Sequence, residues 1–585
     1  MTHSNRGDFA VNVRLLRITA LAALIGVLST LAAWVLLALI RLFTNLFFFQ
    51  AVSLAERSPA NHVLGPWAIA VPVLGGVVIG LMARFGSEKI RGHGIPEAIE
   101  AILFGKSQMS AKVAALKPLA SGIVIGSGGP FGAEGPIIMT GGAIGSLLAQ
   151  LFHLSAVERK ALLVAGATAG MTGVFGTPVA AVLLAVELLL FELRPRSLLP
   201  VAVACAIAGF VRPLLMAPGP LFPLQTSVPT PITFVWCIVA GILCGALAAG
   251  LSISLYRVED LFGKLPIHWM WWPAIGGLAV GIGGWLQPRA LGVGYDVIGD
   301  LLQGHLVLGA ALALLVVKAV IWVISLGSGT SGGVLAPLLM MGAGLGAVLA
   351  HVFPGTDASL WPLVCMAATL AGTMRAPLMA TVFAFGLTQD SNALLPLIAT
   401  SASAYGFTVL TMKRSILTEK IARRGRHIYR EYGVDPLERH FVEEVMTRQA
   451  QALPANARLC DVMDSHFGPQ QVHRAYPVVQ GGRLVGMVDR TTLAAHFTGP
   501  GTVTLDQLCA TAGPAMHAVI GDNCRTVAAR MARHGLERLP VVKDPATLEL
   551  AGIVARSDLI QLSVVNFEEE EKRERLLGMR WGVGP

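Results

Sequence analysis

The chain has 585 residues, of which 54% are hydrophobic and 14% are charged, and its net charge is +9 at neutral pH. A mean hydropathy of +0.66 excludes an ordinary soluble protein of this length. Lys and Arg collect in short connectors and in 413–430, which favours cytoplasmic-loop charge bias over nucleic-acid binding. The seven cysteines form no CxxC pair and are odd in number, so the sequence indicates neither a disulfide framework nor a metal site of the zinc type.

A short polar segment, 1–14, precedes the first apolar run, 18–40, which has no charged residue and is long enough to span a bilayer. No small-residue cleavage site follows it, so we expect a retained membrane helix. The stretches 135–156, 161–186 and 319–356 also lack Asp, Glu, Lys and Arg. Because several runs exceed one span or are cut by Gly and Pro, they predict tilted, broken and re-entrant helices.

The motif Gly-His-Gly-Ile-Pro-Glu occupies 92–97. Glycines followed by Pro near a helix start leave backbone N–H groups pointing outward, because Pro itself contributes no unpaired donor. Such a helix N-terminus carries a partial positive charge and binds anions.

Two Gly-rich breaks, GSGGPFGAEGP at 126–136 and GSGTSGGVLAP at 327–337, resemble each other. Pro136 aligns with Pro337 at an offset of 201 residues. At the same offset, Glu134 aligns with Leu335. A duplicated broken-helix motif that holds one acid inside a membrane indicates an ion site. The three Gly-Pro helix starts contain no Lys or Arg, and a set of amide dipoles suits conduction because it binds a dehydrated anion without trapping it.

After residue 413 the composition becomes that of a soluble domain. This part contains an internal repeat, in which the stretch 537–559 parallels the stretch 474–493. Each copy reads as a strand ending in Pro-Val-Val, a turn, a strand beginning at Gly and a helix start, which resembles paired CBS domains. We expect a linker at 426–442, CBS domains at 443–500 and 501–566, and a tail at 567–585. In that family an Asp at the last helix often holds a nucleotide ribose; Asp558 stands there in the second copy and Thr492 in the first. Asp558 equally fits a helix cap, so a bound adenine nucleotide is only weakly indicated.

The membrane part resembles the CLC family of chloride channels and proton-coupled chloride antiporters. The family signatures GSGIP, G(K/R)EGP and GxFxP stand here as GHGIP (92–96), GAEGP (132–136) and GVLAP (333–337). The resemblance covers about 15–425 and implies an all-α polytopic membrane domain of two inverted repeats, about 15–215 and 225–425. It also implies a homodimer in the cell membrane with the small α/β CBS pair in the cytoplasm. The resemblance implies chloride and other small anions as ligands and membrane lipid as a further partner, and it implies no required cofactor.

The resemblance also assigns roles to single residues. Glu134 matches the gating glutamate, a tethered carboxylate that competes with the outer chloride. The implied anion contacts come from three helix starts, and they are His93, Gly94, Ile95, Ala133, Glu134, Gly135, Val334 and Leu335. Lys117 matches a buried lysine behind the site and adds positive potential. A helix-start carboxylate satisfied only by amides is the alternative reading of Glu134.

Four positions depart from the family pattern. His93 replaces the serine of the central site, and an imidazole either donates to chloride or turns aside to bond with backbone. The tyrosine that closes the inner side would fall near Ile416 and Leu417, where the sequence has none. Ala133 replaces the basic residue before the glutamate. Leu188 stands where antiporters have a proton-collecting glutamate, and Glu187 matches the acid just before it.

Because leucine cannot relay a proton, the sequence favours a gated chloride channel over a proton-coupled antiporter. A water wire, or Glu187 itself, is the alternative relay for the proton, and with such a relay the antiporter remains the alternative function. A third, remote reading is an intramembrane serine protease, since Gly329–Gly333 fits a GxSxG pattern around Ser331 with His351 as the base. Ser331 aligns with Pro130 in the duplicate, which argues against a nucleophile, so we expect no enzyme.

Overall fold

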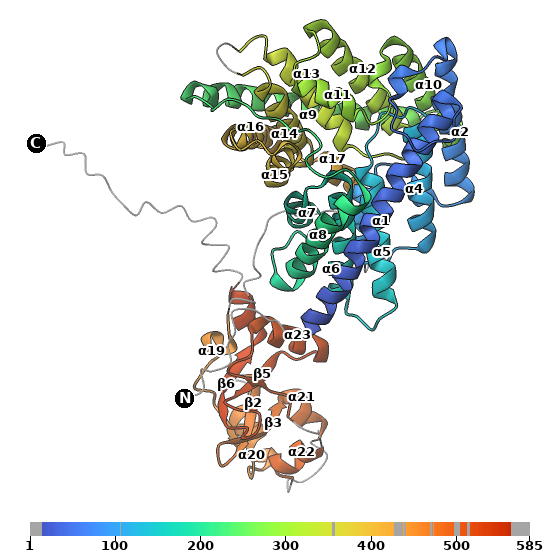
Figure 1. The fold of residues 1–585 in the computed structure, drawn as a ribbon. Coiled ribbons are helices and arrows are strands. Elements are labelled where there is room, and N and C mark those ends of the chain that lie inside the picture. Colours follow the sequence, from blue (N-terminus) through green and yellow to red (C-terminus); the bar gives the residue numbers. More distant parts are fainter. Residues whose placement is uncertain are drawn as a thin grey trace, which may run out of the picture. The chain divides into compact units, whose positions relative to one another are not determined.

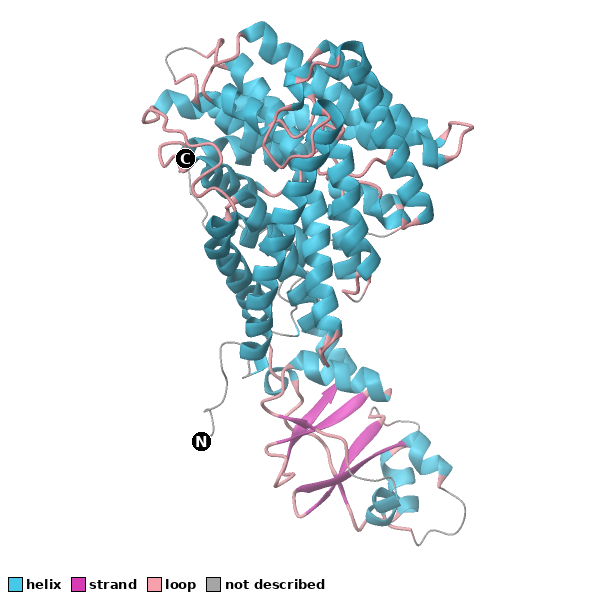
Figure 2. Ribbon diagram, turned by 45° about the vertical axis from the view of Figure 1, so that its right-hand side comes forward, coloured by secondary structure: helices cyan, strands magenta, loops and turns pink. Residues whose placement is uncertain are grey.

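The computed structural model describes residues 14–105, 107–353, 357–425, 437, 440–468, 471, 473–496, 503–511 and 515–562. The predicted segment 1–14 except its last residue, most of the 426–442 linker and the 567–585 tail lie outside these residues. The chain divides into two compact units, 1–431 and 432–585. The first unit is helical, and the second contains the strands drawn in magenta in Figure 2.

The first unit consists of two runs of helices that follow one another in the chain, blue to teal and then green to orange in Figure 1. The first run comprises α1 (Arg14–Phe49), α2 (Ala70–Phe85), α3 (Ile95–Leu103), α4 (Ala111–Gly126), α5 (Glu134–Gln150), α6 (Ala156–Phe175), α7 (Pro178–Leu184), the π-helical turn η4 (Ala185–Leu190) and α8 (Pro195–Leu215). The second run comprises α9 (Pro231–Gly263), α10 (Trp272–Leu286), α11 (Tyr295–Leu302), α12 (Leu308–Gly327), α13 (Leu335–Leu349), α14 (Leu360–Met374), α15 (Pro377–Thr388), α16 (Leu394–Thr411) and α17 (Ile416–Arg423).

The two runs repeat the same design. Each opens with its longest helix, 36 residues in α1 and 33 in α9. In each run a helix starts at the Gly-rich break, α5 in the first and α13 in the second, and a later helix starts at a proline, α7 at Pro178 and α15 at Pro377. Proline is favoured in the first helical turn because its missing N–H has no partner there. The likeness of the two loops thus extends to the long opening helices and to the later helices that start at a proline.

The paired helices α5–α6 and α13–α14 approach closely because small residues face the partner backbone. A methyl group on Gly145 would stand 2.2 Å from the carbonyl oxygen of Leu162, and one on Gly346 would stand 2.2 Å from that of Trp361. Membrane helices pack through such small residues because lipid supplies no hydrophobic force between them. The glycines that recur in the two loops thus continue as a packing face in the helices that follow.

Six helices among the described residues are long and apolar enough to cross a membrane. They are Arg14–Phe49, Gly65–Phe85, Pro195–Leu215, Pro231–Gly263, Leu308–Gly327 and Leu394–Arg423. Large apolar side chains are exposed around them, among them Phe210 at 81% and Leu410 at 88%. A soluble protein rarely exposes so many, whereas a membrane protein presents them to lipid.

The second unit contains two three-stranded sheets of the same topology. One has β1 (Leu453–Pro454), β2 (Ala475–Gln480) and β3 (Arg483–Asp489), and the other β4 (Ala518–Val519), β5 (Arg538–Val542) and β6 (Leu550–Ala555). In each, the first strand pairs in parallel with the second, and the second pairs antiparallel with the third. The remaining helices are α19 (Val442–Val445), α20 (Leu459–His466), α21 (Arg490–Ala495), α22 (Leu505–Thr511) and α23 (Cys524–His534).

The Pro-Val-Val motifs occupy equivalent places in these sheets. Pro477 pairs with Met487 across the first hairpin, and Pro540 pairs with Ile553 across the second. Each hairpin has its register irregularity at the two valines that follow the proline. The strand–turn–strand–helix repeat expected from the sequence is thus confirmed.

Candidate anion pathway

The two Gly-rich loops bond to each other at equivalent positions. The amide of Gly132 donates to the carbonyl of Gly333 at 3.3 Å, and the amide of Gly333 donates to the carbonyl of Gly132 at 3.0 Å. These glycines are 201 residues apart, which is the offset that aligns the two loops. The reciprocal pair therefore lies where the two repeats meet.

Three helix starts gather around this pair. The structure begins α3 at Ile95, α5 at Glu134 and α13 at Leu335, as the Gly-Pro motifs predict. The amide of Gly92, at the start of the first motif, donates to the carbonyl of Gly329 in the second loop at 3.4 Å. Amides at helix starts carry partial positive charge, so this meeting point favours an anion.

Gly135 marks how tightly these starts are packed. A methyl group on Gly135 would stand 1.9 Å from the carbonyl oxygen of His93 and 3.2 Å from the Cα of Gly333. Only a residue without a side chain fits at this crossing, which explains the Gly between Glu134 and Pro136.

The side chain of Glu134 is fully buried at this crossing. Its Oε1 accepts a hydrogen bond from the amide of Leu335, the first residue of α13. Its Oε2 is buried and has no hydrogen-bond partner among the described residues. One carboxylate oxygen therefore occupies a helix N-terminus that otherwise favours a free anion. The second oxygen has no hydrogen-bond partner among the described residues.

His93 is 1% exposed, and neither ring nitrogen has a hydrogen-bond partner in the described part of the chain. The alternative in which the imidazole turns aside to bond with backbone is thus not what the structure has. Gly94 follows as the N-cap of α3 with φ of 89°, a conformation that favours glycine. Its amide donates to the carboxylate of Glu97 at 3.0 Å. The Gly94 amide is therefore engaged inside the helix cap, whereas the neighbouring imidazole retains its hydrogen-bonding capacity.

Lys117, on α4, is fully buried beneath the same motif. Its ammonium donates to the carbonyls of Ile90 and Gly92, each at 2.8 Å. The charge thus lies behind the segment that carries His93 and fixes that segment before α3 begins.

Lys318 is the counterpart of Lys117 in the second repeat, and the sequence analysis missed it. Its buried ammonium donates to the carbonyls of Ala290 at 2.9 Å and Gly292 at 2.8 Å. The offset of 201 residues, already known from the loops, maps one lysine onto the other. The segment held by Lys318 leads into α11, whose N-cap Gly294 has φ of 78° like Gly94 in α3.

The inner positions that depart from the family pattern lie on several elements. Leu188 is fully buried in the π-helical turn η4. The carboxylate of Glu187 accepts from the amides of Leu378 at 3.3 Å and Met379 at 2.7 Å, at the start of α15. An acid at a helix start is stabilised by the helix dipole, so these contacts give Glu187 a capping role.

Tyr256, which lies far away in the sequence, contacts Ile416, near the position where the family pattern has a tyrosine and this chain has none. The hydroxyl of Tyr256, on α9, donates to the carbonyl of Ile416, the first residue of α17. Leu417 beside it is fully buried. Because Tyr256 and Ile416 are 160 residues apart, no local pattern signals this contact.

A cavity of about 540 Å³ opens next to the GHGIP motif. Its lining includes Gly92, Glu97, Glu259, Arg91 and Lys420. The ammonium of Lys420 lies 3.8 Å from the Glu97 carboxylate. This ion pair links α17 to α3 at the wall of the cavity. The cavity reaches the residue next to His93 and is lined by charges of both signs.

The protease reading finds no support at Ser331. Its hydroxyl is buried and lies 3.1 Å from the hydroxyl of Ser121. The Nδ1 of His351, in the turn after α13, bonds instead to the carbonyl of Ala347 in the last turn of that helix. Neither contact pairs the serine with a base.

Both acids at the helix starts of the CBS repeat act as caps. The Asp558 carboxylate accepts from the amide of Ala555 at 2.8 Å. Asp489 accepts from the amide and the hydroxyl of Thr492, each at 2.7 Å. These contacts fit the helix-cap reading of Asp558, whose other carboxylate oxygen accepts from the hydroxyl of Ser557 at 3.4 Å.

Comparison with known proteins agrees with this architecture. The family model described as "Voltage gated chloride channel" matches residues 74–409, and that of the CBS domain matches 442–499 and 517–564. The H(+)/Cl(-) exchange transporter ClcA of Salmonella arizonae is 26% identical over 408 residues, which cover 66% of this chain and 85% of that protein.

Two solved structures share the fold. The structure of a slow cyanobacterial Cl-/H+ antiporter aligns with a TM-score of 0.63 and 21% identity, over 70% of this chain and 98% of its own. That of a eukaryotic CLC transporter aligns with a TM-score of 0.60 and 18% identity, over 93% of this chain and 98% of its own.

The helical unit with its paired Gly-rich loops and the two matching sheets after it thus have one explanation. The chain belongs to the CLC family of membrane-embedded anion transporters and carries two CBS domains.

Proposed function

We propose that this chain exchanges chloride for protons across the membrane, with Glu134 as the group that both competes with chloride and carries the proton. The observation that carries the proposal is the contact between the Glu134 carboxylate and the amide of Leu335 at the start of α13. That amide is one of the anion contacts expected from the family pattern, so carboxylate and chloride compete for one donor. Protonation removes the charge of Glu134 and with it the competition.

The anion contacts in this proposal are the helix-start amides of Ile95, Ala133, Gly135, Val334 and Leu335, together with the His93 imidazole. Burial of these groups away from water strengthens their interaction with a dehydrated anion. Lys117 adds long-range attraction from behind the first motif. Gly94 contributes mainly by shaping the cap, because its amide donates to Glu97.

Proton exchange is favoured over passive conduction by the nature of the similar proteins, which include H(+)/Cl(-) exchangers and a Cl-/H+ antiporter by their descriptions. The proton's inner route in this chain does not pass through residue 188, because a leucine stands there. We place it in the charged cavity beside Gly92, the residue that precedes His93 in the chain.

A passive gated chloride channel is the second candidate, and Leu188 is the observation in its favour. The buried leucine removes the usual inner acid, and Glu187 is committed to the start of α15. A chain without an inner proton route would retain the Glu134 gate and conduct chloride alone.

Purified protein in liposomes, with chloride and proton movements recorded together, separates the two candidates. An outward chloride gradient should drive uphill proton uptake that a protonophore abolishes. The matched control is Glu134→Gln, which should move chloride without protons. Chloride flux with no proton movement in the unaltered protein would select the channel, and absence of chloride flux in both proteins would contradict both candidates.

For the remaining parts, we propose a homodimer with one pathway in each subunit and with the CBS pair in the cytoplasm. An adenine nucleotide bound near Asp558 would couple the energy state of the cell to transport. Truncation after Val442 tests the regulatory role, since the shortened protein should transport chloride but lose any response to added ATP.

A further inference from the structure

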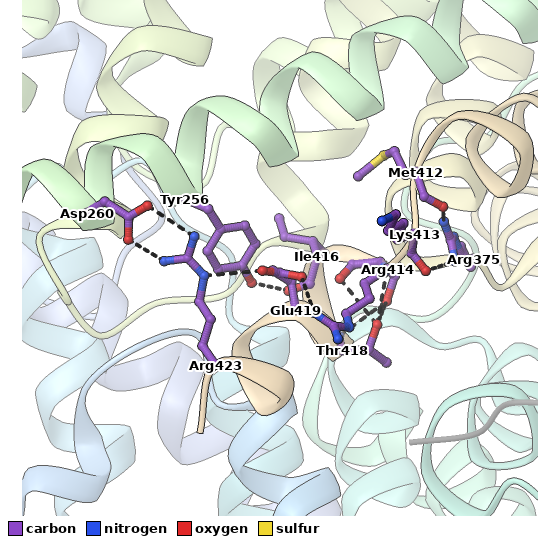
Figure 3. Close-up of polar contacts among 11 residues, drawn as sticks. Tyr256, Asp260, Arg375, Met412, Lys413, Arg414, Ile416, Thr418, Glu419 and Arg423 are labelled. Atoms are coloured by element: carbon purple, nitrogen blue, oxygen red, sulfur yellow. Dashed lines mark hydrogen bonds and ion pairs between the residues drawn. The ribbon is translucent and has the colours of Figure 1, made fainter. Parts of the chain in front are cut away.

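A second charged cavity, of about 340 Å³, lies between the end of α9 and the start of α17. Its lining includes the cations Arg257, Lys413, Arg414 and Arg423 and the carboxylates Asp260 and Glu419. Figure 3 shows the contacts around it, with Arg423 reaching between Asp260 and Glu419. The cavity therefore carries an excess of positive charge.

Two of these cations are already paired. Arg423 donates to Asp260 at 3.2 Å and to Glu419 at 3.3 Å, and its guanidinium stacks on the Tyr256 ring at 4.7 Å. Arg414 donates to Glu419 at 3.4 Å. The two carboxylates are thus occupied by two arginines.

The other two cations have no such partner. Arg257 and Lys413 are exposed, and within the described ranges neither side chain has a hydrogen bond or an ion pair. The backbone that carries Lys413 is fixed, because the guanidinium of Arg375 donates to the carbonyls of Thr408 at 2.9 Å and of Lys413 at 3.4 Å. Two uncompensated charges therefore face a cavity with a defined wall.

The apolar neighbours of these cations indicate how deep in a bilayer the cavity lies. Ile253, one turn before Arg257 on α9, is 45% exposed, and Leu410, three residues before Lys413, is 88% exposed. On α9 and just after the end of α16, a side chain suited to lipid tails thus precedes a cation suited to headgroups. Such a step from exposed apolar residues to Lys and Arg marks the membrane interface, where basic side chains attract anionic headgroups.

We propose that this cavity binds a phosphate group, supplied by the headgroup of an anionic phospholipid, between Arg257 and Lys413. Arg414 and Arg423 stand on the same wall and add donors for the remaining phosphate oxygens. The proposal does not depend on whether the protein is an antiporter or a channel.

A ligand in this cavity is connected to the anion pathway through α17. The cavity wall contains Tyr256 and Ile416, which are joined by a hydrogen bond at the first residue of that helix. One turn later Lys420, and then Arg424, face the Glu97 carboxylate, at 3.8 Å and 2.9 Å. Glu97 in turn caps α3 beside His93. A bound headgroup that shifts the start of α17 therefore acts on the helix start that carries the imidazole.

The test uses the full-length protein, stripped of lipid in detergent, and short-chain phosphatidylglycerol, short-chain phosphatidylcholine and inorganic phosphate as separate probes. Phosphatidylglycerol should bind at least tenfold more weakly to Arg257→Gln/Lys413→Gln than to the unaltered protein, while phosphatidylcholine should bind both proteins equally. The control Lys112→Gln/Lys264→Gln removes two exposed positive charges outside the cavity and should bind phosphatidylglycerol within twofold of the unaltered protein.

The charge-retaining variant Arg257→Lys/Lys413→Arg should restore most of the binding. Inorganic phosphate that binds with the same loss in the double variant would support the site with a soluble source of phosphate. Equal phosphatidylglycerol affinity in the unaltered and double-variant proteins, or an equal loss in the control, would overturn the proposal. Because the readout is binding, absence of transport would leave this result unaffected, and the two proposals fail separately.

Discussion

The carboxylate of Glu134 accepts a hydrogen bond from the amide of Leu335, its counterpart 201 residues later in the second repeat. Equivalent positions of two repeats thus meet across the repeat boundary, one with a carboxylate and the other with only a backbone donor. The duplication by itself would give two equal helix starts. Under the proposed function, the acid on one side makes Glu134 a competitor for the anion at this otherwise symmetric pair of helix starts.

Replacement of Glu134 by Gln should make chloride flux nearly independent of pH. The amide retains the size of the side chain but has no charge to compete for the Leu335 donor. We expect flux to change less than about twofold between pH 5 and pH 7.5, whereas the unaltered protein should slow severalfold as the carboxylate loses its proton. Liposome flux at a series of pH values measures this, and equal pH dependence in both proteins would remove Glu134 from the gate.

Gly135→Ala should disrupt the crossing of the helix starts. The new methyl group would stand 1.9 Å from the His93 carbonyl oxygen, so backbone must move. Overpacking of this kind costs about 1–3 kcal/mol. Thermal unfolding in detergent should show a clearly lowered midpoint, together with loss of chloride binding. Gly309→Ala is the matched control, because a methyl group there meets nothing within 4 Å; equal midpoints for the two variants would contradict the close packing.

The local features of the site could be predicted from sequence because they depend on residues next to one another. The Gly-Pro pattern places the starts of α3, α5 and α13 at Ile95, Glu134 and Leu335, where the structure has them. The repeat offset adds the pairing of the loops. The same offset of 201 residues relates Lys318 to Lys117, so the sequence contains the signal for this second lysine.

The contacts between distant elements could not be predicted in this way. Tyr256 bonds to Ile416 from another helix, and Glu187 caps a helix that starts 190 residues later. Neither contact has a periodicity or a spacing that marks it in the sequence. The engagement of the Gly94 amide by Glu97 is local, but it depends on a rotamer that the sequence pattern leaves open.

Leu188→Glu should increase proton movement if the exchanger proposal is correct. The new carboxylate adds a titratable group on the inner side, where the present route must use the charged cavity instead. We expect a clear rise in proton turnover over the unaltered protein, because a positioned acid promotes proton transfer. Leu188→Gln is the control of similar size without the acid. Proton recording in liposomes decides the matter, and equal proton rates for both variants would show that an acid placed at residue 188 adds no proton route.

His93→Asn should retain chloride binding, whereas His93→Leu should lose much of it. Neither imidazole nitrogen has a hydrogen-bond partner among the described residues, so the ring is available to donate to an anion, and an amide can replace that donor. A hydrogen bond to a charged group contributes about 1.5–3 kcal/mol, which corresponds to a loss of at least tenfold in affinity. Calorimetric titration with chloride is cleanest in the Glu134→Gln background, where no carboxylate competes. Equal affinity of the Asn and Leu variants would show that His93 does not contact the anion.

Lys117→Met and Lys318→Met should separate support of the fold from attraction of the anion. Each substitution leaves two carbonyl oxygens without their ammonium donor, at a cost of about 1–3 kcal/mol for each unsatisfied group, so both variants should unfold at lower temperature. Only Lys117 lies behind the segment that carries His93, and only its loss should also weaken chloride binding. Chloride titration and thermal unfolding of both variants, with the Lys→Arg substitutions as charge-retaining controls, measure the two effects independently. An equal loss of chloride affinity in both would mean that the two repeats attract the anion symmetrically, despite the single acid at Glu134.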